Sequence, residues 1–314
     1  MPDPKPFNES LRDRLAAWRD ATAATTGKAV SNDSLGRKLG YSGTVISKYL
    51  SGVPEGDVPS LETRIEDFLK AAARRAVRDV PPFETAVTRA VHVALECTRR
   101  TDDVALLSGP AGIGKSVGIR TYVSANPLTI AITVTRWSRD DAGVVRLLWD
   151  ELETSSWSGQ VSRARYMEQR LADSQRLIVV DNAHRLSNSA RAWLFDFHDV
   201  TGCPIALVGN PEVLAAIRLN DQQFSRIGLH RRLDMAGNPS VADYARRMVD
   251  AMIPDAPQAL YALAARVAAE RGHLRALRKQ LAAAIDLAAA KAYSGDLVRA
   301  FADAHVLSVR DYEL

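Results

Sequence analysis

The 314-residue chain has little of several features that would place it in a specialised class. Its only two cysteines, Cys97 and Cys203, are far apart and match no metal-binding spacing, which excludes a disulfide framework and indicates a reducing compartment. No apolar run approaches the roughly 18 residues that a membrane span needs. Residues 1–7 are proline-rich and lack the apolar core of a secretion signal, so we expect a cytoplasmic protein.

The rest of the composition is that of an ordinary globular protein. Hydrophobic residues make up 46% and charged residues 25% of the chain, so it can bury a sizeable core, and its length suits about two domains. The sequence contains no internal repeat. The net charge is only +4, but the basic residues cluster, and their location says more about partners than the total does.

One stretch points directly to chemistry. Residues 109–116 read Gly-Pro-Ala-Gly-Ile-Gly-Lys-Ser and fit the nucleotide phosphate loop, G-x-x-x-x-G-K-[ST]. The apolar run 104–107 before it predicts a buried strand, and residues 117–123 after it predict a helix. The glycines let backbone N–H groups face a phosphate, and the helix N-terminus adds partial positive charge. A simple glycine turn is the alternative.

This loop predicts a site for ATP and Mg²⁺. We expect Lys115 to reach the β- and γ-phosphates and Ser116 to ligate Mg²⁺. The residues expected to contact the nucleotide here are Gly109, Pro110, Ala111, Gly112, Ile113, Gly114, Lys115, Ser116 and Val117.

Four apolar runs separated by helical stretches predict a doubly wound α/β domain with a parallel sheet. They cover residues 104–107, 128–134, 177–180 and 205–208. Asp181 ends the third run, where a carboxylate beside the phosphate loop can hold Mg²⁺, usually through water. Asn210 follows the fourth run and can hydrogen-bond the attacking water or the γ-phosphate; turn formation before Pro211 is the alternative.

Asn182 departs from the usual pattern. Many ATPases place Glu directly after the aspartate, where it orients and activates the attacking water. Asn can position a water by hydrogen bonding but cannot accept its proton as a carboxylate does. We therefore predict hydrolysis that is slow or that depends on a partner. His184 could assist, although a helix-cap or surface role is the more ordinary one for such a histidine.

Arginines beyond the fourth strand suggest a contact between subunits. Residues 224–232 follow a helix, and an arginine there can supply positive charge to the γ-phosphate of a neighbouring subunit. Arg226 is the first choice, followed by Arg231 and Arg232. A solvated basic loop or a DNA contact is the alternative.

The chain becomes alanine-rich and helical from residue 236. Residues 244–252, 257–269 and 274–293 predict a helical lid without strands. Arg275 opens the last helix, from which it can touch the γ-phosphate and couple the lid to the nucleotide. A surface arginine is the alternative, since basic runs are usually solvated.

The N-terminal part predicts a separate helical unit. Residues 11–22 predict a helix, and 60–77 predict another with Ser60 as its N-cap. Between them, residues 34–50 predict two helices joined by a tight turn at Gly40, a pattern that resembles the helix-turn-helix of phage repressors. Residues 79–83, with their two prolines, read as the linker to the second domain.

This unit is a candidate DNA-binding module. Residues 34–54 contain no acidic side chain and three basic ones, which suits contact with phosphates. The side chains that the second helix would present to DNA are not rich in arginine, so we expect weak or non-specific DNA binding. A module that docks onto another protein is the alternative. The candidate DNA contacts here are Arg37, Lys38, Thr44, Ser47 and Lys48.

These motifs together resemble the AAA+ ATPases, and among them the ATPases that select target DNA for phages and transposons. The resemblance rests on the helix pair, the Pro-Pro linker, the phosphate loop, the Gly-Asn after the fourth strand, Phe-Ser-Arg-Ile at 224–227 and Gly-x-x-Arg at 272–275. It implies an α/β AAA+ parallel sheet with a C-terminal helical lid, preceded by a small all-α domain. The implied domains are 1–79, 80–235 and 236–314.

The resemblance also implies partners. Similar ATPases bind ATP with Mg²⁺, form filaments or rings on double-stranded DNA without strong sequence preference, and recruit a transposase in a bacterial or phage-infected cytoplasm. A replication initiator or helicase loader, and a signalling or conflict ATPase whose N-terminal helices bind protein, are the alternative functions.

Finally, the resemblance suggests where DNA lies. Loops after the second strand face the central DNA in similar ATPases, which makes Arg136 and Arg139 candidate contacts, with Arg163 and Arg165 as a second pair. Solvated arginines are the alternative. We expect Trp137 to pack against the protein rather than stack on a base.

Overall fold

The computed structural model describes residues 7–26, 29–78, 80–152, 162–172, 174–235, 238–270, 272–289 and 292–310. The chain divides into two compact units, residues 1–79 and 80–314. The N-terminal unit has a hydrophobic core of its own, and the second unit is built around a sheet with a core on each face.

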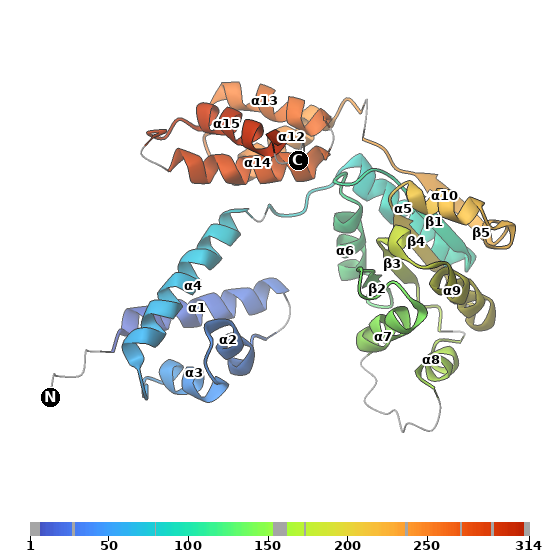
Figure 1. The fold of residues 1–314 in the computed structure, drawn as a ribbon, viewed down its shortest axis with the longest axis horizontal. Helices are drawn as coiled ribbons and strands as arrows, with labels where there is room; N and C mark the ends of the chain where they lie inside the picture. The colour runs from blue at the N-terminus through green and yellow to red at the C-terminus, as the bar shows by residue number, and fades with distance from the viewer. Residues whose placement is uncertain are drawn as a thin grey trace. The chain divides into compact units, whose positions relative to one another are not determined.

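Helices alone make up the described part of the N-terminal unit (Figure 1). They are α1 (Glu9–Thr26), α2 (Asn32–Leu39), α3 (Gly43–Leu50) and α4 (Val58–Arg78). Leu15, Leu35, Ile46 and Ile65 are fully buried between them, one from each helix. The predicted helix, tight turn and second helix are therefore present.

Local hydrogen bonds define the ends of the helix pair. The Ser31 and Ser42 hydroxyls accept the N–H groups of Ser34 and Val45 at the starts of α2 and α3. Gly40 ends α2 with a φ of 77°, a left-handed conformation that glycine adopts without steric cost.

The predicted cap of the next helix is wrong. The Asp57 carboxylate accepts the N–H of Ser60 at 3.2 Å, and α4 already begins at Val58, so Ser60 lies inside the helix. An aspartate caps as well as a serine does, and Pro59 is well suited to the first turn of a helix.

The second unit contains a five-stranded parallel sheet in the order β2-β3-β4-β1-β5. The strands are β1 (Val104–Ser108), β2 (Ile130–Thr133), β3 (Ile178–Asp181), β4 (Ile205–Gly209) and β5 (Ile227–Arg232). The predicted parallel α/β sheet is confirmed, as are the four strands expected from apolar runs.

The fifth strand was not predicted. Residues 227–232 pair with β1 at the edge of the sheet, so the alternative of a basic loop is wrong for them. Arg231 and Arg232 therefore lie in a strand, and both are exposed. Because most side chains of this edge strand face solvent, it lacks the continuous apolar run that marks the buried strands.

Helices cover both faces of the sheet. Alternate strand residues enter two cores: Ala105 and Leu107 pack with α5, α6 and the C-terminal helices, whereas Val104 and Leu106 pack with α7, α8, α9 and α10. The flanking elements are α5 (Ala86–Thr101), α6 (Lys115–Ala125), α7 (Asp141–Glu151), α8 (Arg163–Leu171), the 3-10 turn η1 (Ala183–Arg185), α9 (Asn188–Thr201), α10 (Glu212–Arg218) and α11 (Asp221–Phe224).

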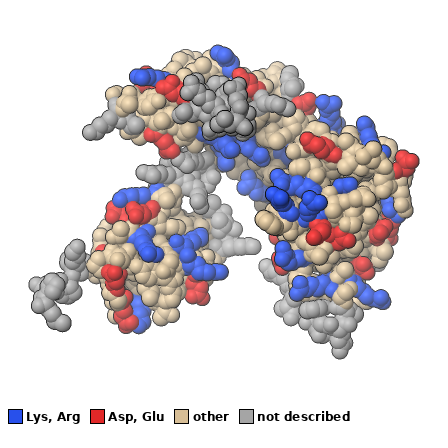
Figure 2. All heavy atoms as spheres, in the orientation of Figure 1, with Lys and Arg blue, Asp and Glu red and all other residues tan. Residues whose placement is uncertain are grey.

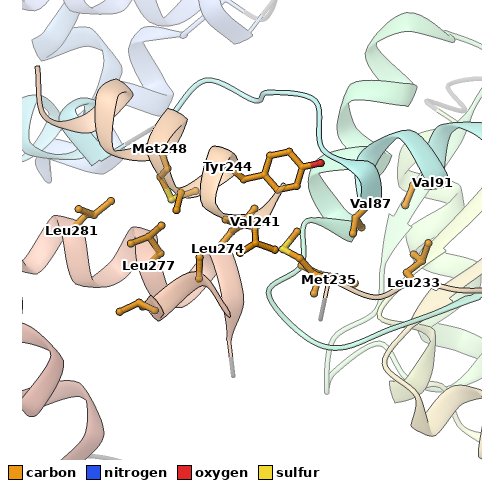
Figure 3. Close-up of a cluster of buried hydrophobic side chains, with 14 of the residues drawn as sticks. Val87, Val91, Leu233, Met235, Val241, Tyr244, Met248, Leu274, Leu277 and Leu281 are labelled. Carbon is orange, nitrogen blue, oxygen red and sulfur yellow. The ribbon is translucent and has the colours of Figure 1, made fainter. Parts of the chain in front are cut away.

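The C-terminal helices form a lid that shares the first of these cores. They are α12 (Val241–Met252), α13 (Gln258–Ala269), α14 (His273–Ala288) and α15 (Leu297–Arg310), the last of which was not predicted. Figure 3 shows Met235 lying between lid residues such as Leu274 on one side and Val87 of α5 and Leu233 on the other. In addition, the Tyr244 hydroxyl accepts the N–H of Ala86 at 2.8 Å. No helix in the described ranges has the length and apolar character to cross a bilayer.

The turn of the helix pair provides a test of the N-terminal unit. A Cβ added at Gly36 would lie 2.5 Å from the Tyr41 carbonyl oxygen, so Gly36→Ala should force α2 away from the turn. We expect a destabilisation of roughly 1–3 kcal/mol, although alanine is the better helix former. Hydrogen exchange of peptides from residues 29–52 should then become faster.

The control for Gly36→Ala is Arg37→Ala, which truncates the exposed neighbour on the same helix. We expect this variant to change the local stability by less than about 0.5 kcal/mol. Equal exchange in the two variants would contradict the close approach at Gly36.

Candidate nucleotide-binding site

Three connections meet at the carboxyl edge of the sheet. The phosphate loop follows β1, Asp181 ends β3, and Asn210 follows β4. The strand register places Ser108 opposite Gly209 and Asp181 opposite Val208, so these connections lie side by side. The carboxyl edge of a parallel sheet is the usual place for a ligand in this class of fold.

The phosphate loop has the backbone that its glycines allow. Gly112 and Gly114 have φ values of 89° and 103°, both in the left-handed region, and Gly114 caps the start of α6. The Gly109 N–H donates to the Gly209 carbonyl at 3.1 Å, which fixes the loop to β4. A side chain at Gly109 would collide with the backbone of Leu233.

Lys115 is a buried cation surrounded by neutral oxygens. Its side chain is only 8% exposed, and its Nζ donates to the carbonyls of Gly109 and Pro110 at 2.6 and 2.7 Å and to Asn210 Oδ1 at 3.4 Å. Burial lowers the pKa of Lys115 to about 8, and the nearby charge of Arg275 lowers it further, while that of Asp181 opposes the shift. Because the hydrogen-bond partners of the Lys115 ammonium are neutral oxygens, the site suits an added anion.

Ser116 and Asp181 form a ready pair of oxygen ligands. The Ser116 hydroxyl donates to Asp181 Oδ2 at 2.6 Å, and Asp181 Oδ1 accepts the N–H of Asn182 at 2.8 Å. Hard oxygens of this kind suit Mg²⁺. The described residues hold no cluster of three or more His, Cys, Asp or Glu side chains, so the remaining ligands would be phosphate and water.

Asn182 connects the end of β3 to the end of β2. Its φ is 58°, a left-handed conformation that asparagine tolerates better than most residues. Its side-chain amide donates to the Val134 carbonyl at 3.4 Å. A carboxylate at this position could not donate this hydrogen bond.

His184 lies within this site, against the surface or helix-cap role that we considered more ordinary. The Asn210 N–H donates to His184 Nδ1 at 3.3 Å, and the Asn210 amide lies 3.5 Å from Nε2. Burial lowers the pKa of His184, which favours the neutral ring that can accept. Glu212, at the start of α10, raises the pKa values of both His184 and Lys115, and it is a carboxylate that sequence reasoning missed.

The lid approaches the phosphate loop at Gly112. A side chain at Gly112 would collide with the Gly272 carbonyl, and its Cβ would lie 3.3 Å from the Arg275 Cβ. Arg275 is exposed in the first turn of α14. The structure therefore brings together the loop and the arginine that the sequence suggested for the lid.

Arg226 lies between α11 and β5 and is engaged within its own chain. Its guanidinium pairs with Asp199 at 2.7 Å and with Asp196 at 3.6 Å, both on α9. A contact with a neighbouring subunit would require Arg226 to exchange these partners for a phosphate.

Two of the candidate DNA contacts of the N-terminal unit have partners within the protein, and the other three are exposed. Lys38 lies 5.6 Å from the centre of the Trp18 ring, and Lys48 forms an ion pair with Glu55. Arg37, Thr44 and Ser47 are exposed on α2 and α3.

The candidate contacts of the second unit are also exposed, and they are Arg136, Arg139, Arg163 and Arg165. Arg163 additionally lies 5.3 Å from the centre of the Trp149 ring. On the face shown in Figure 2, Lys and Arg side chains form several separate groups with acidic side chains between them. This face therefore carries separate basic groups and not one continuous basic surface.

The expectation for Trp137 is wrong. Its side chain is 85% exposed, so it does not pack against the described protein. No local pattern predicts this exposure, because a single tryptophan between arginines is compatible with either environment.

Comparison with known proteins assigns the class. Residues 98–217 match the family described as "AAA domain". The fold is similar to the Aeropyrum pernix ORC2 protein in its ADP form, with a TM-score of 0.57, 16% identity and coverage of 73% of this chain and 72% of that one. A Walker-type ATPase of Pyrococcus abyssi gives a TM-score of 0.53 at 14% identity, covering 76% and 78%. The chain carries an AAA domain, which implies that it binds ATP and is an ATPase.

The distant homologues of the chain have names that describe a narrower function than the AAA domain does. The chain is 23% identical over 193 residues to the "Mu-like prophage FluMu DNA transposition protein B" of Haemophilus influenzae, covering 60% of this chain and 67% of that protein. It is 25% identical over 194 residues to the "ATP-dependent target DNA activator B" of Escherichia phage Mu and of Escherichia phage D108. In the latter two cases the match spans 60% of each protein, less than two thirds of its length.

The burial of Lys115 predicts a pH dependence of nucleotide binding. A phosphate favours the charged ammonium, but the free protein loses the Lys115 proton near its lowered pKa of about 8. Nucleotide affinity should therefore be nearly constant below about pH 7 and should fall by up to about tenfold per pH unit above about pH 8. Titration calorimetry with a non-hydrolysable ATP analogue across this range measures the profile.

Lys115→Arg is the matched control for this profile, because a guanidinium stays charged throughout the range. We expect this variant to bind less tightly but with a flat pH profile. The same decline in Lys115→Arg would assign the titration to another group.

Proposed function

We propose that the protein is an ATP-dependent DNA-binding protein that assembles on target DNA with little sequence preference and recruits or activates a transposase. The main support is the convergence of Lys115, Ser116, Asp181 and Asn210 at one edge of an AAA-type sheet. The distant homologues are themselves named for DNA transposition and for target-DNA activation.

The nucleotide would be held mainly by the phosphate loop. Backbone N–H groups at the start of α6 and the Lys115 ammonium would contact the β- and γ-phosphates. Lys115 would then exchange part of its contact with neutral carbonyls for an anion, which removes the cost of burying its charge. Ser116 and Asp181 would hold Mg²⁺, which neutralises phosphate charge when bound.

The same site is poorly equipped to activate water. Asn210 and His184 would position a water by hydrogen bonding, but the amide of Asn182 stands where many relatives have a base. We infer slow or partner-stimulated hydrolysis. Bound ATP would then act chiefly as a switch for assembly, and hydrolysis would end the assembled state.

Assembly would place one subunit's Arg226 at the γ-phosphate of the next, after release from Asp199 and Asp196. Arg275 would contact the γ-phosphate and so couple the position of the lid to the bound nucleotide. In a closed oligomer, every subunit would place the exposed arginines of its ATPase unit, residues 80–314, along the DNA. The N-terminal helices would add weak contacts of their own.

The switch predicts a nucleotide-dependent DNA affinity. A non-hydrolysable ATP analogue should raise the affinity for duplex DNA by about 5- to 150-fold, the range of typical allosteric couplings, and the affinity should fall steeply with salt. Filter binding with and without the analogue measures this. Lys115→Ala should abolish the effect of nucleotide, whereas Lys279→Ala, which removes an exposed lid lysine, should retain it.

Three outcomes of this experiment would contradict the proposal. Equal DNA affinity with and without nucleotide would remove the switch. A footprint at one preferred sequence would favour a replication initiator. A complete lack of DNA binding at low salt would favour a signalling ATPase whose helical unit binds protein.

Asn182 permits a direct test of slow hydrolysis. Asn182→Asp introduces a carboxylate of the same shape, in a residue type that also tolerates the left-handed backbone. Turnover at saturating ATP should rise by about tenfold or more, within the 10²- to 10⁴-fold that a well-placed general base contributes. A coupled phosphate-release assay measures the rate with and without DNA.

Asn182→Ala is the control, because it removes the amide contact to Val134 without adding a base. It should not raise turnover. If both variants had the wild-type rate, the proposed consequence of Asn182 would be wrong.

A further inference from the structure

The connection between β2 and α7 presents a large aromatic side chain to solvent. Trp137 is 85% exposed, which is unusual for the largest apolar side chain in proteins. It lies between Arg136 and Arg139, which are both exposed. An exposed tryptophan ring beside two cations is a candidate contact for a partner with stackable rings and negative charge.

The connection is a defined turn. The Thr135 N–H donates to the Ser138 hydroxyl at 3.0 Å, and the Trp137 N–H donates to the Thr135 hydroxyl at 3.3 Å. Ser138 itself is only 3% exposed and anchors the turn. A Cβ at Gly143 would lie 2.5 Å from the Ser138 Cα, so α7 packs closely beneath it. Trp137 is therefore held outward by an ordered backbone.

The same turn is attached to the nucleotide site at both ends. At its start, the Val134 N–H donates to the Asp181 carbonyl at 3.0 Å, and the Val134 carbonyl accepts from the Asn182 amide. At its end, the Arg139 carbonyl accepts the N–H of Ser187 at 2.8 Å. The stretch 181–187 thus carries both the nucleotide-site residues and the supports of the turn.

Arginines outnumber carboxylates around the turn, but only by one. Arg185 is exposed on η1, two positions before Ser187, which contacts Arg139. The nearest acidic residues along the chain, Asp140 and Asp141, lie at the start of α7 and keep their negative charge. The Asp140 carboxylate caps that helix by accepting the Gly143 N–H at 2.9 Å. Tryptophan with arginine also occurs in protein interfaces, but two arginines beside one exposed ring, with a third on the connected 3-10 turn, suit phosphates flanking a base.

We propose that Trp137 stacks on a nucleic-acid base while Arg136, Arg139 and Arg185 contact the flanking phosphates. This inference rests on the proposed DNA-binding function and adds a contact to it that is not electrostatic. Base stacking on an aromatic ring is tolerant of sequence, which fits binding with little sequence preference. A base that is already unpaired is easiest to reach, so DNA with a mismatch should bind more tightly than a fully paired duplex.

Salt dependence separates stacking from phosphate contact. DNA affinity is measured with the ATP analogue across a salt series for the wild type, Trp137→Ala, Trp137→Phe and Arg136→Gln. Trp137→Ala should lower the affinity by about 5- to 150-fold without changing the slope of log affinity against log salt, and Trp137→Phe should retain most of the affinity. Arg136→Gln should instead reduce the slope by about one.

Leu128→Ala is the matched control. Leu128 is another exposed large apolar residue, 57% exposed, and it precedes β2 at the opposite end of the strand. This variant should bind DNA as the wild type does, and thermal unfolding checks that each variant is folded.

The outcomes distinguish the two proposals. If the wild type binds DNA and Trp137→Ala binds it equally well, the stacking role is overturned and the proposed function stands; a protein partner for Trp137 would give this result. A reduced salt slope in Trp137→Ala would also overturn stacking, because the loss would be electrostatic. If the wild type fails to bind DNA, both proposals are overturned.

Discussion

The burial of one lysine ammonium among neutral oxygens is the constraint on which the rest of the ATPase unit depends. Lys115 reaches carbonyls of its own loop and the Asn210 side chain after β4, so two strand ends must lie side by side. Left-handed glycines shape that loop, and the lid contacts it where Gly112 meets Gly272. Burial of this charge lowers the pKa of Lys115. A phosphate that binds beside the ammonium would offset the cost of burying it.

The site divides binding from hydrolysis. Its groups for holding phosphate and a hard cation converge, whereas the position after Asp181 carries an amide that contacts β2. That amide links the nucleotide edge to the turn that presents Trp137. In the proposed function, Asn182 would both leave the site without a base and connect the site to this turn, which agrees with a protein in which nucleotide state matters more than turnover.

Much of this architecture could be predicted from sequence because its signals are local. The phosphate loop has fixed spacing, and β1, β3 and β4 are continuous apolar runs since they lie inside the sheet with both faces buried. The edge strand β2 also lies within an apolar run, although it is only partly buried. The edge strand β5 escaped prediction because its exposed arginines interrupt any such run. The last helix, α15, was also missed. The predicted lid helix extended to residue 293, whereas α14 ends at Ala288 and α15 begins at Leu297.

Other features depend on contacts between distant residues, which no local pattern encodes. His184 joins the site through Asn210, and Arg226 is held by two aspartates of α9. Whether Trp137 packs or is exposed depends on how the turn is supported by Ser138 and by residues 181–187. These are the positions where the structure changed the interpretation of the sequence.

The central claim is that ATP joins subunits into an assembly on DNA. Electron microscopy of the full chain with a non-hydrolysable ATP analogue and duplex DNA tests it most directly. The account predicts an ordered oligomer on DNA in which each nucleotide lies between Lys115 and Asp181 of one subunit and Arg226 of the next. Isolated monomers on DNA, or an oligomer in which Arg226 remains paired with Asp199 far from any phosphate, would contradict it.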